Sequence, residues 1–502
     1  MDQPARGWRR APRLFSLLRC FVLNRATLFN RKQPVLRYIS TRGEAPILDF
    51  TGALLAGLAR DGGLYLPETW PTLDTSTIEA FAGKPYAQVA QRVMSPFVGD
   101  AIPADVFSDM LSKAYAGFRH PATTPLVQLG DNLFVLELFH GPTLAFKDVA
   151  MQILGRMMDH ALAKRGERAT IVGATSGDTG AAAIEAFHGL DNVDVFILYP
   201  HGKVSEAQRR QMTTVAAPNV HALAIEGNFD DCQAIVKGLF NHHAFRDGLG
   251  LAGVNSINWA RVMAQIVYYF TSAVALGGPR RKVSFAVPTG NFGDILAGYA
   301  AKRMGLPVGR LVVATNENDI LERALASGVY ETKKVHETAS PSMDIQVSSN
   351  FERLLFEANG RDAAEIRAEM GALAQSGRFE LSKLQRENVA VDFDAFRTGE
   401  IGCAKEIRRV WEEANYLIDP HTAVGLHAAR KALARDPATP MVALATAHPA
   451  KFAGAIQAAV GKTADLPPHL ADLMTRREHF TVLANSQAEV EAFMRRNSRA
   501  AS

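Results

Sequence analysis

The chain has 502 residues, 47% of them hydrophobic and 21% charged, which is the composition of a globular protein large enough for two or three domains. It contains no apolar run of about 18 residues, which argues against a transmembrane helix. Its three cysteines, Cys20, Cys232 and Cys403, lie far apart, which argues against a disulfide framework or a zinc site. We therefore expect a cytoplasmic protein without a bound metal.

The formal net charge of +4 arises at one end of the chain. Residues 1–36 hold eight basic residues and one acidic residue, so the remainder is mildly acidic and offers no basic stripe to a nucleic acid. The arginine-rich start resembles an organellar transit peptide. An unstructured extension, or a start codon placed too far upstream, is the favoured interpretation. We expect residues 1–37 to be such a basic extension.

Residues 38–100 are expected to form a small helical lead-in. After about residue 120, apolar strand-like segments alternate with amphipathic ones. The expected strands are 168–174, 194–200, 220–227, 282–288, 311–315 and 441–447, and the expected helices are 180–187, 205–212, 230–240, 294–304 and 319–327. This alternation predicts an α/β protein whose parallel strands are covered on both faces.

Residues 351–418 interrupt this alternation with charged, helix-like segments. We interpret them as a helical insertion in the second α/β unit. The predicted organisation is a catalytic α/β region at 101–460 that contains this insertion, followed by a C-terminal helical tail at 461–502.

Lys147 stands in the stretch HGPTLAFKD, residues 140–148, among glycine, proline and apolar residues. A surface lysine needs no such setting. A nucleophilic lysine does, because a partly desolvated ammonium loses its proton more easily. Its neighbour Asp148 could orient the amine or cap the following helix, and capping is the simpler interpretation.

Two glycine-rich turns follow expected strands. GATSGDTG, residues 173–180, offers main-chain N–H groups and the hydroxyls of Thr175, Ser176 and Thr179 to an anion at a helix N-terminus. PTGNFGD, residues 288–294, lacks the lysine of a nucleotide phosphate loop and fits a single phosphate monoester better. Capped βα turns are the alternative in both cases. With Lys147, the two turns make the set that a pyridoxal-phosphate enzyme requires.

Seven segments, in order along the chain, resemble threonine synthases of the longer form found in many bacteria and fungi. They are YISTRG (38–43), DGGLYLPE (61–68), HGPTLAFKD (140–148), TSGDTG (175–180), SINWAR (256–261), PTGNFGD (288–294) and LATAHPAKF (444–452). Seven motifs in sequence make the resemblance specific. It implies two doubly wound α/β domains of the fold type II pyridoxal-phosphate enzymes, similar to the tryptophan synthase β subunit. It also implies conversion of O-phospho-L-homoserine and water into L-threonine and phosphate.

The resemblance implies a role for each matching residue. Lys147 would form the Schiff base with the cofactor, and Thr446 would face the pyridine nitrogen. The phosphate of the cofactor would lie on Gly290, Asn291, Phe292, Gly293 and Asp294. The substrate carboxylate would lie on Thr175, Ser176, Gly177, Asp178 and Thr179.

The substrate phosphate requires cations, since charge-assisted contacts to phosphate are strong. Arg261 and Lys203 are the candidates, although a helix-face ion pair and a solvated loop charge explain them equally well. A metal site at His140 and His448 has little support, because no clustered ligands accompany them. We expect a monomer or homodimer that acts on a small molecule, without nucleic acid or membrane.

Two other functions remain open. A lyase on the same scaffold would release phosphate from O-phosphohomoserine but form 2-oxobutyrate and ammonia, and it would share most of these motifs. A non-catalytic binding protein of this fold would be expected to lose the lysine or break the phosphate loop, and the sequence keeps both.

Overall fold

The computed structural model describes residues 36–253 and 255–501. The chain divides into two compact units, Met1–Val35 and Leu36–Ser502. The basic extension expected at 1–37 lies almost wholly outside the described residues. Every helix and strand described here belongs to the second unit.

The lead-in is helical but begins with a two-stranded ribbon. β1 (Tyr38–Ser40) pairs antiparallel with β2 (Tyr65–Pro67). The helices of this part are α1 (Phe50–Ala56), α2 (Thr75–Glu79), α3 (Tyr86–Val98) and α4 (Ala104–Tyr115). Asp49 and Asp74 begin α1 and α2 by accepting main-chain N–H groups, as N-cap aspartates do.

One of the two large sheets has five strands, all parallel, in the order β15-β7-β6-β5-β8. The strands are β5 (Ala169–Ala174), β6 (Val193–Pro200), β7 (Val220–Glu226), β8 (Leu251–Ala252) and β15 (Thr481–Ala484). Its helices include α6 (Asp178–Phe187), α7 (Glu206–Thr213), α8 (Phe229–Asn241) and α9 (His243–Gly248). Every residue of β6 is buried, which explains the unbroken apolar run seen in the sequence.

The other large sheet has six strands in the order β13-β10-β9-β14-β4-β3. The strands are β3 (Leu126–Gly130), β4 (Leu133–Glu137), β9 (Val283–Pro288), β10 (Val308–Thr315), β13 (Phe393–Arg397) and β14 (Met441–Ala445). All neighbours are parallel except β3 and β4, which form an antiparallel pair at one edge. The predicted α/β class is confirmed, but this sheet is mixed rather than purely parallel.

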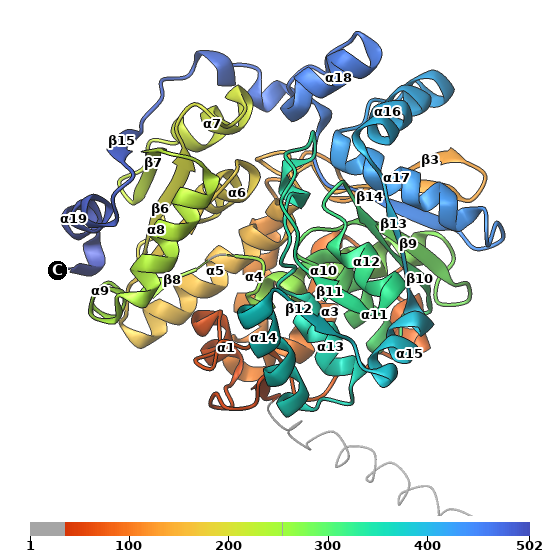
Figure 1. Cartoon of the computed structure of the whole chain (residues 1–502), viewed down its shortest axis with the longest axis horizontal. Helices are drawn as coiled ribbons and strands as arrows, with labels where there is room; N and C mark the ends of the chain where they lie inside the picture. Colours follow the sequence, from red (N-terminus) through yellow and green to blue (C-terminus); the bar gives the residue numbers. More distant parts are fainter. Residues whose placement is uncertain (1–35, 254, 502) are drawn as a thin grey trace, which may run out of the picture. The chain divides into compact units, whose positions relative to one another are not determined.

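Long buried helices separate the two sheets (Figure 1). α5 (Lys147–Arg165) contacts α6 of the five-stranded sheet and also α10 (Trp259–Ala275), which in turn contacts α11 (Gly293–Arg303). α10 is buried without interruption from Trp259 to Phe270. On the six-stranded sheet, α17 (Pro420–Leu433) packs against β9, β10 and β14.

Two ranges expected to be helical also contain strands. The range 351–418 holds four helices, yet its strand β13 joins the six-stranded sheet beside β10, and β12 pairs with β11. The range 461–502 contributes β15 to the five-stranded sheet. The remaining elements are α12 (Ile320–Ser327), β11 (Val329–Glu331), α13 (Phe351–Ala358), α14 (Ala363–Ser376), β12 (Arg378–Glu380), α15 (Lys383–Asp392), α16 (Glu400–Ala414), α18 (Ala453–Val460) and α19 (Gln487–Asn497). The division into domains stays a prediction.

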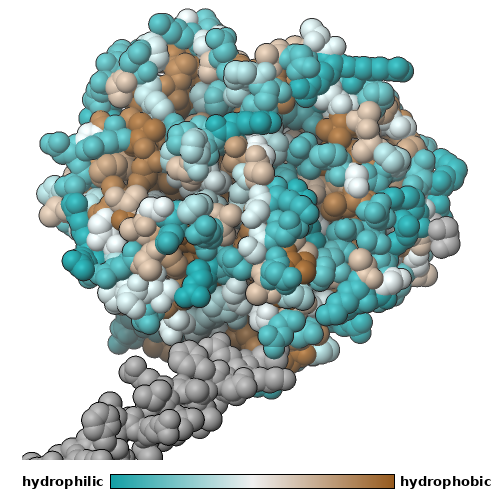
Figure 2. All heavy atoms as spheres, turned by 180° about the vertical axis from the view of Figure 1, so that it is seen from behind, coloured by the Kyte–Doolittle hydropathy of each residue, from teal (hydrophilic) through white to brown (hydrophobic). Residues whose placement is uncertain are grey.

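The surface mixes polar and apolar side chains. On the face shown in Figure 2, brown apolar groups are separated by teal polar side chains. Among residues 36–253 and 255–501, no helix combines the length and the apolar character needed to cross a membrane.

Candidate active site

Lys147 is the first residue of α5, and hydrogen bonds stabilise the turn that precedes it. Asp148 accepts hydrogen bonds from the main-chain N–H of Thr143 at 2.8 Å and from its hydroxyl at 2.6 Å. A Cβ added to Gly141 would lie 2.5 Å from the Asp148 side chain, so only glycine fits beside it. Asp148 therefore ties the turn together rather than capping α5, which is a different role from the one favoured in the sequence.

The Lys147 side chain is buried, and its Nζ lies 3.7 Å from Oδ2 of Asp178. Burial lowers the pKa of Lys147 to about 8, against the attraction of Asp178. Lys451 and Arg261 lower it further by charge repulsion. Roughly a tenth of this amine is consequently unprotonated at pH 7, far more than at the ordinary lysine pKa, and the unprotonated amine is the form that a nucleophile or general base requires.

The turn at residues 173–180 joins β5 to α6, which begins at Asp178. The hydroxyl oxygen of Thr175 accepts hydrogen bonds from the N–H groups of Gly177 at 2.9 Å and Gly180 at 3.0 Å, so it acts as an internal cap. Ser176 and Thr179 are half-buried. Their hydroxyls make no hydrogen bond within the described part of the chain, and they remain the donors best suited to a bound anion.

Asp178 is held from several sides. Its Oδ1 lies 2.7 Å from Nζ of Lys451 and accepts a hydrogen bond from Nε2 of Gln208 at 2.8 Å. Burial opposes its ionisation, but Lys451 and Lys147 outweigh burial and hold the pKa of Asp178 well below its usual range. The carboxylate therefore stays charged beside Lys147.

The turn at residues 288–294 joins β9 to α11, and its carbonyl groups are occupied. The Gly290 carbonyl accepts from the Ser348 hydroxyl at 2.6 Å. The Asn291 carbonyl accepts from the side-chain amide of Asn350 at 2.8 Å and from its main-chain N–H at 3.1 Å. Phe292 takes a left-handed conformation, with φ of 62°.

Three consecutive N–H groups of the same turn have no acceptor among the described residues, although the preceding one, of Thr289, donates to the Ala314 carbonyl at 2.8 Å. Within residues 36–253 and 255–501, those of Gly290, Asn291 and Phe292 donate to no protein atom. They stand at the N-terminus of α11, where the helix dipole favours an anion. A Cβ at Gly290 would lie 2.9 Å from the Ser342 carbonyl, so the turn leaves no room for a side chain there. This turn fits a phosphate group.

Asp294 was expected among the phosphate-binding residues, and its carboxylate lies elsewhere. Its Oδ1 accepts hydrogen bonds from the hydroxyls of Tyr268 and Tyr269, the latter at 3.0 Å, on α10. Burial raises the pKa of Asp294 to about 6 although both tyrosines oppose the shift. Of this residue, only the main-chain N–H suits a phosphate.

Thr446 follows β14 and lies beside the lysine turn. Its carbonyl accepts from the N–H of Phe146 at 2.8 Å, and Ala145 and Ala447 form an antiparallel bridge. Thr446 itself is buried. The structure thus brings Thr446 next to Lys147, from a segment about 300 residues away.

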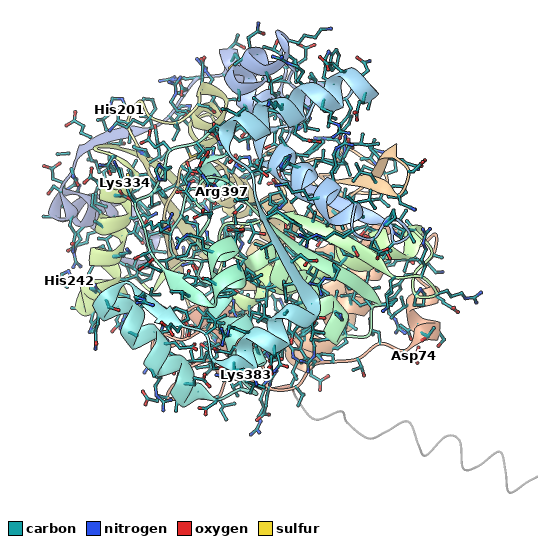
Figure 3. The ribbon with its side chains drawn as sticks, turned by 45° about the vertical axis from the view of Figure 1, so that its right-hand side comes forward. Asp74, His201, His242, Lys334, Lys383 and Arg397 are labelled. Atoms are coloured by element: carbon teal, nitrogen blue, oxygen red, sulfur yellow. The ribbon has the colours of Figure 1, made fainter. Side chains whose placement is uncertain are left out.

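The two candidate cations for the substrate phosphate differ in position. Arg261 lies in the first turn of α10, where burial lowers its pKa to about 10. Its charge also lowers the pKa of Lys147, so it lies within electrostatic reach of the amine. Lys203 is exposed on the loop after β6. It follows His201 by two residues, and Figure 3 shows His201 at the outer edge of the molecule. Arg261 alone joins the site.

Comparison with known proteins places this site in a family. Three family models match: threonine synthase N terminus at residues 37–115, pyridoxal-phosphate dependent enzyme at 118–382, and threonine synthase C-terminal at 422–494. The chain is 53% identical to a threonine synthase of Pseudomonas aeruginosa over 91% of this chain and 98% of that protein. The chain belongs to the threonine synthase family.

Solved threonine synthase structures have the same fold. The pyridoxal-phosphate-bound enzyme of Brucella melitensis is 60% identical, with a TM-score of 0.91 over 92% of this chain and 100% of that one. The yeast enzyme is 40% identical, with a TM-score of 0.87 over 92% of this chain and 99% of that one. The predicted threonine synthase resemblance, fold type and pyridoxal-phosphate cofactor are confirmed, and the chain is a pyridoxal-phosphate-dependent enzyme.

Some residues of this threonine synthase family site escaped the sequence interpretation. Lys451 lies inside the motif LATAHPAKF, and Asn350 ends the stretch SPSMDIQVSSN, but neither had a role. Arg353 is buried and donates to Asn350 and to the carbonyls of Tyr65 and Ile257. Only the folded chain shows that Lys451 contacts the 173–180 turn and that Asn350, held by Arg353, contacts the 288–294 turn.

His140 and His448 each contact another group among the described residues. Nε2 of His140 lies 2.6 Å from Glu137, and burial lowers the pKa of His448 to about 4. In the part of the chain that the structure describes, no group of three or more His, Cys, Asp or Glu side chains could hold a metal ion.

Proposed function

We propose that the chain converts O-phospho-L-homoserine and water into L-threonine and phosphate, with pyridoxal phosphate held at Lys147. The observation that carries this proposal is the buried Lys147 amine, which stands among the glycine-rich turns and Thr446. Membership of the threonine synthase family supports the choice of substrate and product.

Lys147 Nζ would hold the aldehyde carbon of the cofactor. The N–H groups of residues 290–294 would bind its phosphate, and the Thr446 hydroxyl would face its pyridine nitrogen. When bound, the cofactor supplies an electron sink for the bonding electrons of the substrate carbons. A neutral hydroxyl such as that of Thr446 does not hold the ring nitrogen protonated as a carboxylate would.

Lys147 would also move protons during the reaction. With a pKa of about 8, its amine can take the proton from Cα of the substrate and exchange protons at Cβ near neutral pH. The carboxylates of Asp178 and Asp294 lie within electrostatic reach and stabilise its protonated form. Lys147 would thus serve as cofactor anchor and as general acid and base.

The substrate itself would lie between the two turns. Its carboxylate would accept from Ser176, Thr179 and the main-chain N–H groups at the start of α6, where the helix dipole favours an anion. Asp178 would contribute its main-chain N–H rather than its carboxylate, which Lys451 occupies. Arg261 would stabilise the substrate phosphate, since a buried guanidinium is a strong phosphate partner.

The lyase reaction that forms 2-oxobutyrate is not favoured, because the relatives compared above that are 53% and 60% identical to this chain are threonine synthases. A product assay decides between the two. Purified protein with pyridoxal phosphate would receive O-phospho-L-homoserine, and phosphate, threonine and 2-oxobutyrate would be measured together. We expect one threonine for each phosphate released.

Lys147→Ala should lower this activity by at least roughly 100-fold, because the proton-transfer group is lost. Lys383→Ala is the matched control, since that lysine lies on the outside of α15 (Figure 3) with its side chain 82% exposed. Phosphate accompanied by 2-oxobutyrate would support the lyase. Unchanged activity in Lys147→Ala would refute the role of this lysine.

We further propose that the protein acts in the cytoplasm as a monomer or homodimer, without nucleic acid. Cys232 and Cys403 are free and buried, which suits a reducing compartment.

A further inference from the structure

A second buried lysine, Lys451, contacts the same carboxylate as Lys147, that of Asp178. Lys451 belongs to a short 3₁₀ turn (Pro449–Phe452), and its side chain is 0% exposed. Its Nζ lies 2.7 Å from Oδ1 of Asp178 and donates to the Thr143 carbonyl at 2.8 Å. One ammonium group therefore joins three segments: the 444–452 segment, the 173–180 turn and the lysine turn.

Packing alone does not explain a charge at this position. Burying an ammonium carries a desolvation cost that an ion pair often offsets only partly, and a neutral side chain of similar length would avoid that cost. The partners of Lys451 are themselves fixed, since Gln208 donates to Asp178 at 2.8 Å and Gln211 donates to the Thr143 carbonyl at 3.1 Å. The charge of Lys451 is therefore better explained by its effect on neighbouring groups than by packing.

The carboxylate of Asp178 is shared unequally between two lysines. Its Oδ1 is 2.7 Å from Lys451, whereas its Oδ2 is 3.7 Å from Lys147. The nearer partner fixes the carboxylate, and the longer distance leaves Lys147 without a full ion pair. Lys451 also repels the ammonium form of Lys147 directly.

We propose that Lys451 is a positioning residue for the amine of Lys147, because it holds the Asp178 carboxylate in an ion pair of its own and keeps it from closing on Lys147. This inference rests on the proposed role of Lys147 as cofactor anchor and base. Without the charge of Lys451, Asp178 would turn to Lys147 and hold its proton more firmly. The other charged groups that face Lys147 are Arg261 on α10, Asp294 on α11 and its neighbour Asp148.

The test measures the Lys147 amine without catalysis. In the full chain freed of cofactor, acetic anhydride labels unprotonated amines, and mass spectrometry of the Lys147 peptide gives its labelling rate from pH 6 to 10. Lys451→Gln keeps an amide donor for Asp178 and Thr143 but removes the charge. We expect labelling at pH 7.5 to slow by roughly tenfold and the labelling profile to move about one unit toward alkaline pH.

Lys451→Arg retains the charge and should restore most of the wild-type profile. Lys383→Gln, on an exposed lysine, should leave it unchanged. Asp178→Asn should accelerate labelling, and adding Lys451→Gln to it should then have less effect than in the wild type, because the two residues act together. A wild-type profile in Lys451→Gln would overturn the proposal.

If Lys451→Gln does not fold, the labelling profiles of Lys451→Arg and Asp178→Asn test the proposal instead. An unchanged Lys147 labelling profile in Asp178→Asn would overturn the proposal. Failure of the proposed function would appear separately, as wild-type holoenzyme that forms no threonine while the labelling results stand.

Discussion

Two aspartates occupy matching places in the two halves of the site and differ in how easily they take up a proton. Asp178 and Asp294 each lie in the first turn of a helix that follows a glycine-rich turn, and Lys147 lies within electrostatic reach of both. Asp178 has Lys451 at 2.7 Å, and its pKa lies well below the usual range. Asp294 has two tyrosine hydroxyls instead, and burial raises its pKa to about 6.

The difference shows what each turn is suited to do. A carboxylate at a phosphate site would repel the ligand, so Asp294 is placed under α10, and the N–H groups of residues 290–292 stay open. At the other turn the carboxylate remains ionised beside the reactive amine, where a neighbouring cation balances it. The two aspartates thus occupy similar positions in their helices. The partner that a distant segment supplies to each carboxylate determines the direction in which its pKa is shifted.

Among substitutions at residues that support the two turns, Gly177→Ala should lower activity the most. It should disturb only the turn that holds Asp178. Gly177 has φ of 140°, and an added Cβ would lie 2.4 Å from the Gln208 side chain that holds Asp178. Strain of this kind costs on the order of 1–3 kcal/mol, so we expect kcat/KM to fall roughly 100-fold while cofactor affinity changes little. Steady-state kinetics and cofactor titration measure the two.

Gly189→Ala is the matched control, since its φ is 73° and no atom lies within 4 Å of the added Cβ. Equal losses of activity in both variants would show that backbone strain alone, and not the hold on Asp178, is responsible.

Asn350→Ala should disturb the opposite turn. Its side-chain amide supports the Asn291 carbonyl at 2.8 Å, and its oxygen accepts from Arg353, so truncation leaves buried polar groups unpaired. A loss of about 1–2 kcal/mol corresponds to a cofactor Kd raised roughly tenfold. Titration with pyridoxal phosphate should show this.

Asn388→Ala removes a comparable bond, to the Ala358 carbonyl at 2.7 Å, and should leave cofactor affinity unchanged. If Asn350→Ala binds the cofactor as tightly as the wild type, the 290–292 N–H groups do not hold the phosphate.

The sequence predicts features that depend on local contacts better than features that depend on contacts between distant segments. The alternation of apolar and amphipathic segments predicted β5, α6 and β9 closely, because their periodicity is local. It missed β15, a four-residue strand defined by pairing with β7. Lys147 could be singled out from its motif, whereas Lys451 could not, because its burial and its bond to Asp178 exist only after distant segments meet.

Asp294→Asn should have the smallest effect, a change in the free energy of unfolding. The sign of this change should be opposite for the matching substitution of Asp178. Since burial raises the pKa of Asp294 from 3.8 to about 6, the folded chain binds a proton that the unfolded chain releases between these pH values. The contribution of this residue to stability is therefore present below pH 4 and is lost as pH rises through 6. Asparagine keeps an acceptor for both tyrosines and does not ionise. We expect Asp294→Asn to gain on the order of 1 kcal/mol over the wild type between pH 4 and 7, by denaturant unfolding of the cofactor-free protein.

Asp178→Asn should show the opposite sign, because the pKa of Asp178 is lowered in the folded chain. Its contribution is present above the unfolded pKa and is lost as pH falls, so this variant should be destabilised at pH 7 and approach the wild type in acid. Parallel pH profiles in the two variants would mean that Lys451 does not distinguish the aspartates. Diverging profiles would support the view that one buried cation, placed by a distant segment, makes one of the two similar carboxylates the harder to protonate.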